Sequence, residues 1–274
     1  MFLALWETEG VGIFDPMSPT ALTLWTSGAA TVVNPYSIDV EEDGEVAWFT
    51  AGEDNWIFGN LNLNPGLPDS TPDINMWEST TATTMETECL RWDPDVGTVG
   101  RLFISADNTD AGADELGKFD PASPAVLRHY GVCTDEAGLY GIDVEPGEES
   151  AWISEWEQPG ALAEVDATGD GIAPTIALTQ TTVEDPVSTT EPVPHPWVYQ
   201  IAPKTCPITP NVYTVEDRCD GDLIHPEEFP ISPTSQPTSV AVKDIAADFG
   251  VIHETWTADT FDDRIVVVLE YYIF

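Results

Sequence analysis

The sequence predicts an all-β fold: a β-propeller of six four-stranded antiparallel blades, with five or seven blades as alternatives, forming a single domain over residues 1–274. Two observations predict it. Aromatic anchors followed by Thr or Ser recur along the chain, and segments of alternating apolar residues lie upstream of most of them. A hydrophobic fraction of 42% supplies a core, which excludes a disordered acidic chain.

The anchors mark one strand of each predicted blade. Successive anchors are 42, 55, 49, 61 and 43 positions apart, near the ~40 to 50 residues of one blade. We expect their rings to pack between neighbouring blades, with ligand stacking as the alternative. The six anchors are Trp6-Glu7-Thr8, Trp48-Phe49-Thr50, Phe103-Ile104-Ser105, Trp152-Ile153-Ser154, Tyr213-Thr214 and Trp256-Thr257.

An inner strand is expected upstream of five anchors, joined to the anchor strand by a turn rich in Gly and acidic residues, such as Glu41-Glu42-Asp43-Gly44. These inner strands are 35–40, 89–93, 140–144, 196–201 and 237–242. Third strands follow most anchors, at 56–61, 117–121, 161–166 and 264–269, and a fourth strand is expected at 126–130. The Thr-rich stretch from Thr179 to Pro194 reads as a long loop.

Two repeats carry a resemblance to a known family. Asn34–Val40 with Ala47–Thr50, and Leu139–Val144 with Ala151–Trp156, resemble the blade repeats of streptogramin B lyases and the wider NHL and gluconolactonase-like propellers. The resemblance covers about half of the chain at the level of fold. It implies a ligand at the central channel, and a His base beside acidic residues that hold magnesium. It points to His253 and Glu254 as the catalytic candidates, although no catalytic motif is matched.

The two ends of the chain are expected to pair with each other. The first repeat lacks room for an inner strand before Trp6, and the last repeat lacks a clear outer strand before Phe274. Pairing of the N- and C-terminal strands would close the ring and remove exposed sheet edges. The alternative for the apolar C-terminal segment is a contact between subunits.

The charge of the chain predicts a protein adapted to high salt. There are 49 acidic residues against 8 Lys and Arg, a formal net charge of -41. At ~1 M salt the Debye length falls to ~3 Å, so the self-repulsion is screened. The acids are scattered, which favours a solvated acidic surface over a patch for a cationic partner. Nucleic-acid binding is excluded because it relies on Lys and Arg. No segment is long enough to span a membrane, and no standard signal peptide is predicted.

Cysteines and acidic turns give two further candidate sites. Cys206 and Cys219 flank a segment of hairpin length and are candidates for a disulfide; Cys89 and Cys133 are a second pair, with buried free thiols as the alternative for both. The run from Asp166 to Gly171 resembles half of a calcium loop, so Asp166 and Asp170 are candidate ligands for Ca²⁺ or Mg²⁺. A solvated turn is the alternative.

Two classes of function remain open. The first is a non-enzymatic structural or recognition propeller in a high-salt extracellular assembly, such as a virion decoration, a tail or spike, or a cell-surface component. Its partners would be neighbouring proteins, a second copy of the chain, or a glycan or host-surface ligand bound through exposed Trp such as Trp77, Trp156 or Trp197. The second is a metal-dependent enzyme of the lyase or lactonase kind.

Overall fold

The fold of the described chain is entirely β. The computed structural model describes residues 2–5, 10–14, 21–26, 35–41, 44–51, 55–63, 72–97, 99–109, 113–135, 138–145, 149–156, 160–183, 186–192, 227–232, 237–247, 250–259 and 264–273. For β1 and β16 to β20 the description is of the backbone alone. These residues form 20 strands and no helix, which confirms the all-β prediction.

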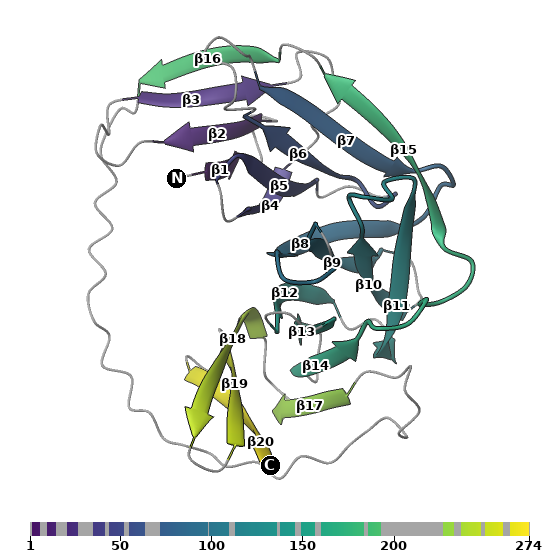
Figure 1. Cartoon of the computed structure of the whole chain (residues 1–274), viewed down its shortest axis with the longest axis vertical. Coiled ribbons are helices and arrows are strands. Elements are labelled where there is room, and N and C mark those ends of the chain that lie inside the picture. Colours follow the sequence, from purple (N-terminus) through teal and green to yellow (C-terminus); the bar gives the residue numbers. More distant parts are fainter. Residues whose placement is uncertain are drawn as a thin grey trace.

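The strands form four antiparallel sheets that follow one another around an arc (Figure 1). The first sheet contains β1 (Phe2–Leu5), β2 (Gly10–Phe14), β3 (Ala21–Thr26) and β16 (Val187–Pro192). The third contains β12 (Leu139–Val144), β13 (Ser150–Glu155), β14 (Gly160–Asp166) and β17 (Glu227–Ser232). The fourth contains β18 (Pro237–Ala247), β19 (Gly250–Asp259) and β20 (Arg264–Ile273).

The second sheet has nine strands because one strand joins two four-stranded halves. One half is β4 (Pro35–Val40), β5 (Val46–Ala51), β6 (Phe58–Asn62) and β7 (Asp73–Ser79). The other is β8 (Met85–Asp93), β9 (Arg101–Asn108), β10 (Ala113–Phe119) and β11 (Val126–Asp135). β15 (Ile176–Val183) pairs with β7 on one side and with β11 on the other. The end strands β4 and β8 are in contact, so the sheet is nearly closed.

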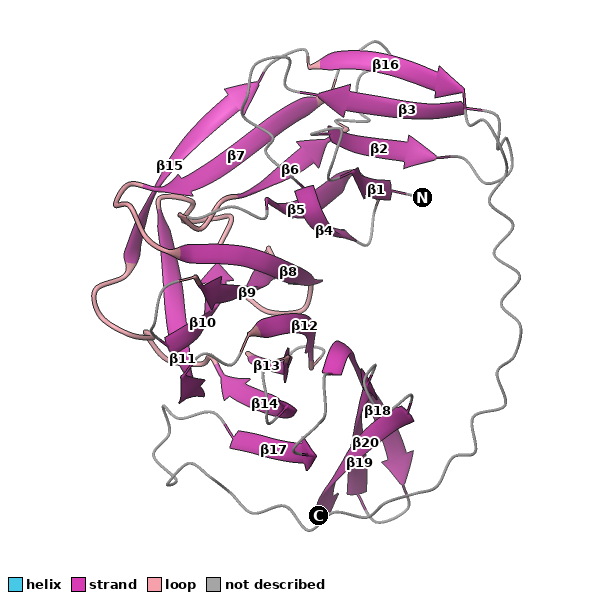
Figure 2. Ribbon diagram, turned by 180° about the vertical axis from the view of Figure 1, so that it is seen from behind, coloured by secondary structure: helices cyan, strands magenta, loops and turns pink. Residues whose placement is uncertain are grey.

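The strands β1, β4, β8, β12 and β18 form the inner side of the arc, as both views of the ribbon show (Figure 2). Consecutive members of this series are in contact. We call them the inner strands. The predicted strands at 35–40, 140–144 and 237–242 coincide with inner strands, and the segment 89–93 is the second half of β8.

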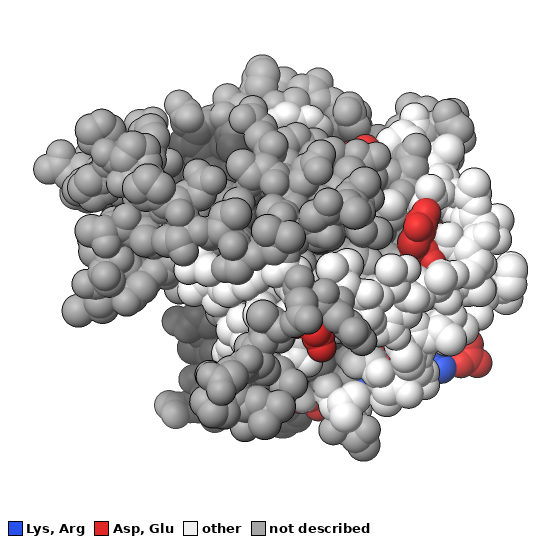
Figure 3. Space-filling view, turned by 90° about the horizontal axis from the view of Figure 1, so that it is seen from above, with Lys and Arg blue, Asp and Glu red and all other residues white. Residues whose placement is uncertain are grey.

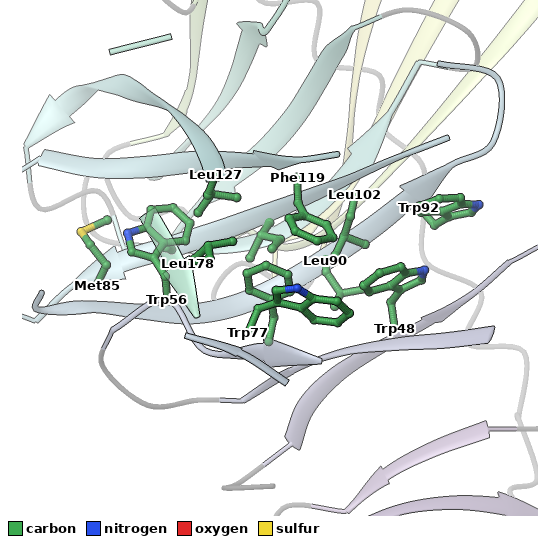
Figure 4. Packing of buried hydrophobic residues seen from close by; sticks show 13 residues of the cluster. Trp48, Trp56, Trp77, Met85, Leu90, Trp92, Leu102, Phe119, Leu127 and Leu178 are labelled. Carbon is green, nitrogen blue, oxygen red and sulfur yellow. The ribbon is translucent and has the colours of Figure 1, made fainter. Parts of the chain in front are cut away.

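A core of aromatic side chains lies between the halves of the nine-stranded sheet (Figure 4). The rings of Trp48 and Trp92 stack with their centroids 5.8 Å apart, and those of Phe58 and Phe119 meet edge to face at 5.0 Å. Burying one such side chain stabilises the fold by about 1.5–3 kcal/mol. The anchor aromatics Trp48, Phe103 and Trp152 are all buried in strands, while their place between propeller blades stays a prediction.

Separate apolar clusters lie on either side of this core. Phe103 and Leu116 of the nine-stranded sheet pack with Ile142 and Ile153 of the third sheet. Val11 of the first sheet packs with a group from β5 to β7 that comprises Ala47, Phe49, Ala51, Leu61, Ile74 and Met76. Each pair of neighbouring four-stranded units is therefore joined by its own apolar layer.

Two predictions about the strands are wrong. The terminal strands do not pair, because β1 pairs with β2 and β20 pairs with β19, in different sheets. The first sheet takes its outer strand from β16, so it is completed without the C-terminus. The stretch predicted as a loop from Thr179 to Pro194 contains most of β15 and all of β16. Its many Thr residues are β-branched and suit strands.

Candidate functional site

Every inner strand from β4 onward carries a β-bulge near its start. The register shifts between Pro35 and Ile38 in β4, and the same irregularity recurs in β8, β12 and β18. A bulge interrupts the hydrogen-bonded ladder and re-aims the side chains within it. The bulge residues are Tyr36 and Ser37, Glu88 and Cys89, Tyr140 and Gly141, and Thr238 and Ser239.

In the three repeats whose anchor side chains are described, the anchor hydroxyl is hydrogen-bonded to the bulge beside it. The Oγ1 atom of Thr50 accepts a hydrogen bond from the backbone N–H of Ser37 at 3.0 Å and donates to the carbonyl of Glu88 in β8 at 2.6 Å. A buried N–H left out of the ladder needs such a partner. Thr50 therefore ties the bulge of β4 to the next inner strand.

Ser105 repeats this arrangement one unit further along the arc. Its Oγ accepts from the N–H of Cys89 at 3.1 Å and donates to the carbonyl of Tyr140 in β12 at 3.2 Å. Ser154 accepts from the N–H of Gly141 at 2.8 Å. The Thr or Ser that identified the repeats in the sequence is thus the residue that links successive units.

Three aromatic side chains lie side by side where the bulges of β4 and β12 meet. The hydroxyls of Tyr36 and Tyr140 are hydrogen-bonded to each other, and their rings meet edge to face with centroids 5.8 Å apart. The ring of Tyr140 also contacts Trp156, which directly follows β13, at 5.8 Å. All three side chains are partly exposed. We call Tyr36, Glu88, Tyr140 and Trp156 the inner-strand cluster.

The bulge of β8 contributes a carboxyl and a thiol with shifted pKa values. Burial raises the pKa of Glu88 to about 7, and the nearby charges of Glu86 and Asp107 act in the same direction. Burial, followed by the charge of Glu88, raises the pKa of Cys89 to about 12. Near neutral pH the thiol is therefore protonated, while Glu88 is divided between its two forms.

The tyrosine hydroxyl at the centre of the cluster stays neutral. Burial and the hydrogen bond to Tyr140 raise the pKa of Tyr36 well above its ordinary value. The hydroxyl therefore acts as a hydrogen-bonding group and is not an ionised nucleophile. Rings with fixed hydroxyls and a nearby carboxyl form a surface that offers both stacking and hydrogen bonds.

An ion-pair network connects the same three inner strands. Arg91 of β8 lies 2.9 Å from Asp143 of β12 and 3.5 Å from Asp39 of β4. Asp39 and Asp143 stand opposite the anchors Trp48 and Trp152 in the strand register. Arg91 stands opposite Phe103, the equivalent place in its own unit. A cation thus occupies in one repeat the position that an acid occupies in its two neighbours.

The other described cations are also paired with acids. Arg101 lies 3.1 Å from Asp120, Lys118 lies 2.8 Å from Glu149, and Arg128 lies 3.7 Å from Asp170. Acidic side chains appear at separate places on the described part of the face in Figure 3, in line with their scatter along the sequence. The basic side chains that the structure describes, those of Arg91, Arg101, Lys118 and Arg128, are therefore all engaged within the chain.

The candidate metal ligands lie in a turn held against the sheet. Asp166 accepts a hydrogen bond from the N–H of Thr168 at 2.8 Å, and Asp170 is fully exposed beside Arg128. Tyr130 donates to the carbonyls of Ala167 and Gly169. Within the described part of the chain, no three His, Cys, Asp or Glu side chains are placed to hold a metal ion. The magnesium site that the family resemblance implies stays a prediction, because the side chains of His253 and Glu254 lie outside those that the structure describes.

The His residues are held in different ways. His129 lies 2.8 Å from Glu115 and 3.1 Å from the carbonyl of Pro174, so its ring nitrogens anchor the turn after β14. Burial lowers the pKa of His129, but the hydrogen bond and charge of Glu115 outweigh this and leave the pKa raised. His253, the predicted base, lies in β19 opposite Asp244 and Glu270, and Glu254 lies opposite Lys243 and Leu269. Their catalytic role stays a prediction.

The predicted disulfides have separate outcomes. Cys206 and Cys219 lie outside the described residues. Cys89 is a free thiol, as the alternative for that pair expected. Cys133 belongs to β11, which is separated from β8 by the strands β10 and β9. Strands about 4.8 Å apart put it beyond the reach of a disulfide with Cys89.

The tryptophans expected to bind ligand also differ from one another. Trp77 is only 5% exposed and belongs to the aromatic core, so its predicted exposure is wrong; its place in β7 turns it toward the other half of the sheet. Trp156 is partly exposed, and Trp197 lies outside the described residues. Tyr36, Glu88 and Tyr140 are functional candidates that the structure adds to those predicted from the sequence. The sequence does contain a signal for these bulge residues. Two residues precede the regular apolar alternation in the inner strands, as Tyr36 and Ser37 precede Ile38.

No protein-family model and no curated protein matches the chain. In the part of the chain that the structure describes, no helix is long and apolar enough to cross a membrane.

Proposed function

We propose that the protein is a non-enzymatic recognition propeller adapted to high salt, and that the inner-strand cluster binds a neutral glycan. The observation that carries this proposal is the partly exposed row of rings formed by Tyr36, Tyr140 and Trp156. Sugar rings present apolar C–H faces that stack on aromatic side chains, and their hydroxyls need donors and acceptors nearby. Glu88 and the tyrosine hydroxyls supply those groups.

The charge of the protein favours a neutral ligand over an anionic one. The chain has a net charge of -41, and Arg91, the cation nearest the cluster in sequence, is already shared between Asp39 and Asp143. A sulfated or sialylated glycan would find no cation among the described side chains that is not already paired with an acid. Neutral hexoses are therefore the proposed ligand class.

The groups around the cluster are better suited to binding than to chemistry. The hydroxyls of Thr50, Ser105 and Ser154 are engaged by the backbone of the bulges, and Cys89 has a pKa of about 12. A nucleophile needs an adjacent base or a lowered pKa, and these groups have the opposite arrangement. This supports the reading that the ligand is held and left unchanged.

The propeller itself is part of this proposal. Five groups of strands begin with the inner strands β1, β4, β8, β12 and β18, and consecutive inner strands are in contact. Four of these groups have four strands when β16 and β17 are counted with the sheets that they complete. We infer five blades, one of the predicted alternatives, with β15 as an additional strand between two of them. The repeat resemblance to lyase-like and NHL propellers belongs to this proposal.

A place in a larger extracellular assembly in brine would explain why the chain carries so many acidic residues. An excess of acidic residues keeps a protein dispersed where salt screens its charge, as on a virion or a cell surface in brine. The test is the mass of the protein isolated from its source in salt above ~1 M, with co-eluting proteins identified. A defined multi-protein particle supports the assembly, and a free chain of 29.8 kDa overturns it.

The ligand proposal is tested by titrating the purified protein with a panel of neutral oligosaccharides in ~2 M KCl and following Trp fluorescence. Replacing Trp156→Ala removes one stacking surface and should weaken binding by about tenfold, the effect of losing one aromatic contact. The exposed Thr179→Ala, on β15, is the matched control and should bind as the wild type does. Equal binding by both variants would overturn the assignment of the cluster.

A second candidate function, an enzyme, is favoured by one observation. The carboxyl of Glu88 has a pKa of about 7, the value that suits a general acid or base near neutral pH. A lyase or lactonase would convert its ligand, with Glu88 as a further proton-transfer group beside the predicted His253 and Glu254. Recovery of a chemically altered ligand would decide for this candidate.

A further inference from the structure

The last sheet has an open edge on its long C-terminal strand. β20 pairs with β19 along its whole length, from Arg264 opposite Asp259 to Ile273 opposite Gly250. Among the described strands it has no other partner, and its sheet has three strands where the first and third sheets have four. No other described strand pairs with the backbone N–H and C=O groups on the outer side of β20, and such an edge is a template for a further strand.

The outer strands of the two complete sheets are protected in ways that β20 is not. β16 and β17 are six residues long, carry acidic residues and contain Pro192 and Pro230. Short length, charge and Pro discourage the addition of another strand. β20 is ten residues long, lacks Pro and contains five consecutive aliphatic residues from Ile265 to Leu269. Such an edge is suited to strand addition.

The two charges on β20 are placed symmetrically within the strand. Arg264 and Glu270 lie three positions on either side of Val267. If a second copy of β20 pairs antiparallel about a two-fold axis at Val267, Arg264 stands opposite Glu270 of the second copy, and the contact occurs twice. Ile265 then stands opposite Leu269, and Val266 opposite Val268. Shifting this register by two residues breaks both charge pairs, and a shift of one residue exchanges the faces of the strand.

We propose that two copies of the chain associate edge to edge through β20, in the antiparallel register centred on Val267, to form one six-stranded sheet. The contact is independent of the glycan proposal, since it uses a different sheet. Each copy carries a net charge of -41, so the dimer requires salt that screens the repulsion between copies. The dimer should weaken as the salt is diluted. Without screening, the negative charges of the two copies repel each other over their whole surfaces, and the mostly apolar pairing of the strands does not offset this repulsion.

The test is light scattering after size exclusion on the full chain in ~2 M KCl, with Arg264→Glu, Glu270→Arg and the double variant. The wild type should have twice the chain mass of 29.8 kDa. Each single variant places like charges opposite each other twice and should weaken dimerisation by about tenfold. The double variant restores unlike pairs and should recover the affinity.

Three outcomes would overturn the proposal. A monomer at every concentration in high salt excludes the contact. A dimer unchanged in both single variants places the contact elsewhere. Weakening by the single variants without recovery in the double variant excludes the register. Circular dichroism of each variant identifies a folding failure, and in that case Val267→Glu, which sets like charges together on the two-fold axis, replaces the affected variant and must give a monomer.

Discussion

Arg91 and Asp143 form an ion pair of 2.9 Å between β8 and β12, the inner strands of two neighbouring units. The same guanidinium reaches Asp39 of β4, so one cation spans three inner strands in a chain that has few cations. The carboxylate of Asp39 also accepts the N–H of Trp92 at 2.8 Å. The side-chain links between units are therefore concentrated at equivalent positions of the inner strands, beside the inner-strand cluster.

Replacing Arg91→Met should lower the free energy of unfolding by about 1–2 kcal/mol, because it leaves two carboxylates uncompensated on adjacent strands. The measurement is urea denaturation in ~2 M KCl. Arg128→Met is the control. Its pair with the fully exposed Asp170 is 3.7 Å long, and its loss should change stability by less than about 0.5 kcal/mol. Equal effects of the two variants would contradict a special role for Arg91.

Replacing Thr50→Val keeps the shape of the side chain but removes the hydroxyl that serves Ser37 and Glu88. The partly buried N–H of Ser37 then lacks its partner, and the free energy of unfolding should fall by about 1–3 kcal/mol. The exposed Thr179→Val should be nearly neutral under the same urea denaturation. If Thr50→Val is also neutral, the anchor hydroxyls do not link the units.

Replacing Gly117→Ala should destabilise the core by about 1–3 kcal/mol through overpacking. A Cβ atom at Gly117 would lie 2.6 Å from Cζ3 of Trp56, whose side chain is fully buried. A Cβ at Gly169 meets nothing within 4 Å, so Gly169→Ala is the matched control. The stability is measured as the melting temperature. If the melting temperature falls for Gly169→Ala and not for Gly117→Ala, Trp56 does not pack as described.

The pH dependence of stability should change in Glu88→Gln. The pKa of Glu88 is raised to about 7 in the folded protein, above the value of 4.5 in an unfolded chain, so the folded state binds the proton more tightly. The stability that this group contributes is complete below pH ~4.5 and is lost as the pH rises through 7, by about 1 kcal/mol after screening. Unfolding measured from pH 4 to 9 should therefore fall less steeply in Glu88→Gln than in the wild type. Parallel curves would contradict the shift.

Local sequence patterns predicted much of the fold and little of the candidate site. The alternation in Pro35–Val40 and the turn before Trp48 predict a hairpin from local chemistry alone, and β4 and β5 form it. The pairing of β15 and β16 with strands more than 100 residues earlier leaves no local signal, so local patterns predict a loop for this Thr-rich segment. The cluster escaped prediction because it depends on bulges, which place Tyr36 and Tyr140 together from strands about 100 residues apart.

Incubating the protein with a glycan that it binds, and analysing the recovered ligand by mass spectrometry, shows whether the inner-strand cluster holds a neutral glycan without converting it. We expect saturable binding in ~2 M KCl, loss of affinity in Trp156→Ala, and recovery of the ligand with its mass unchanged. A ligand of altered mass, with the alteration abolished in Glu88→Gln, would contradict the claim and make the protein an enzyme. Failure of every neutral glycan to bind would contradict it as well.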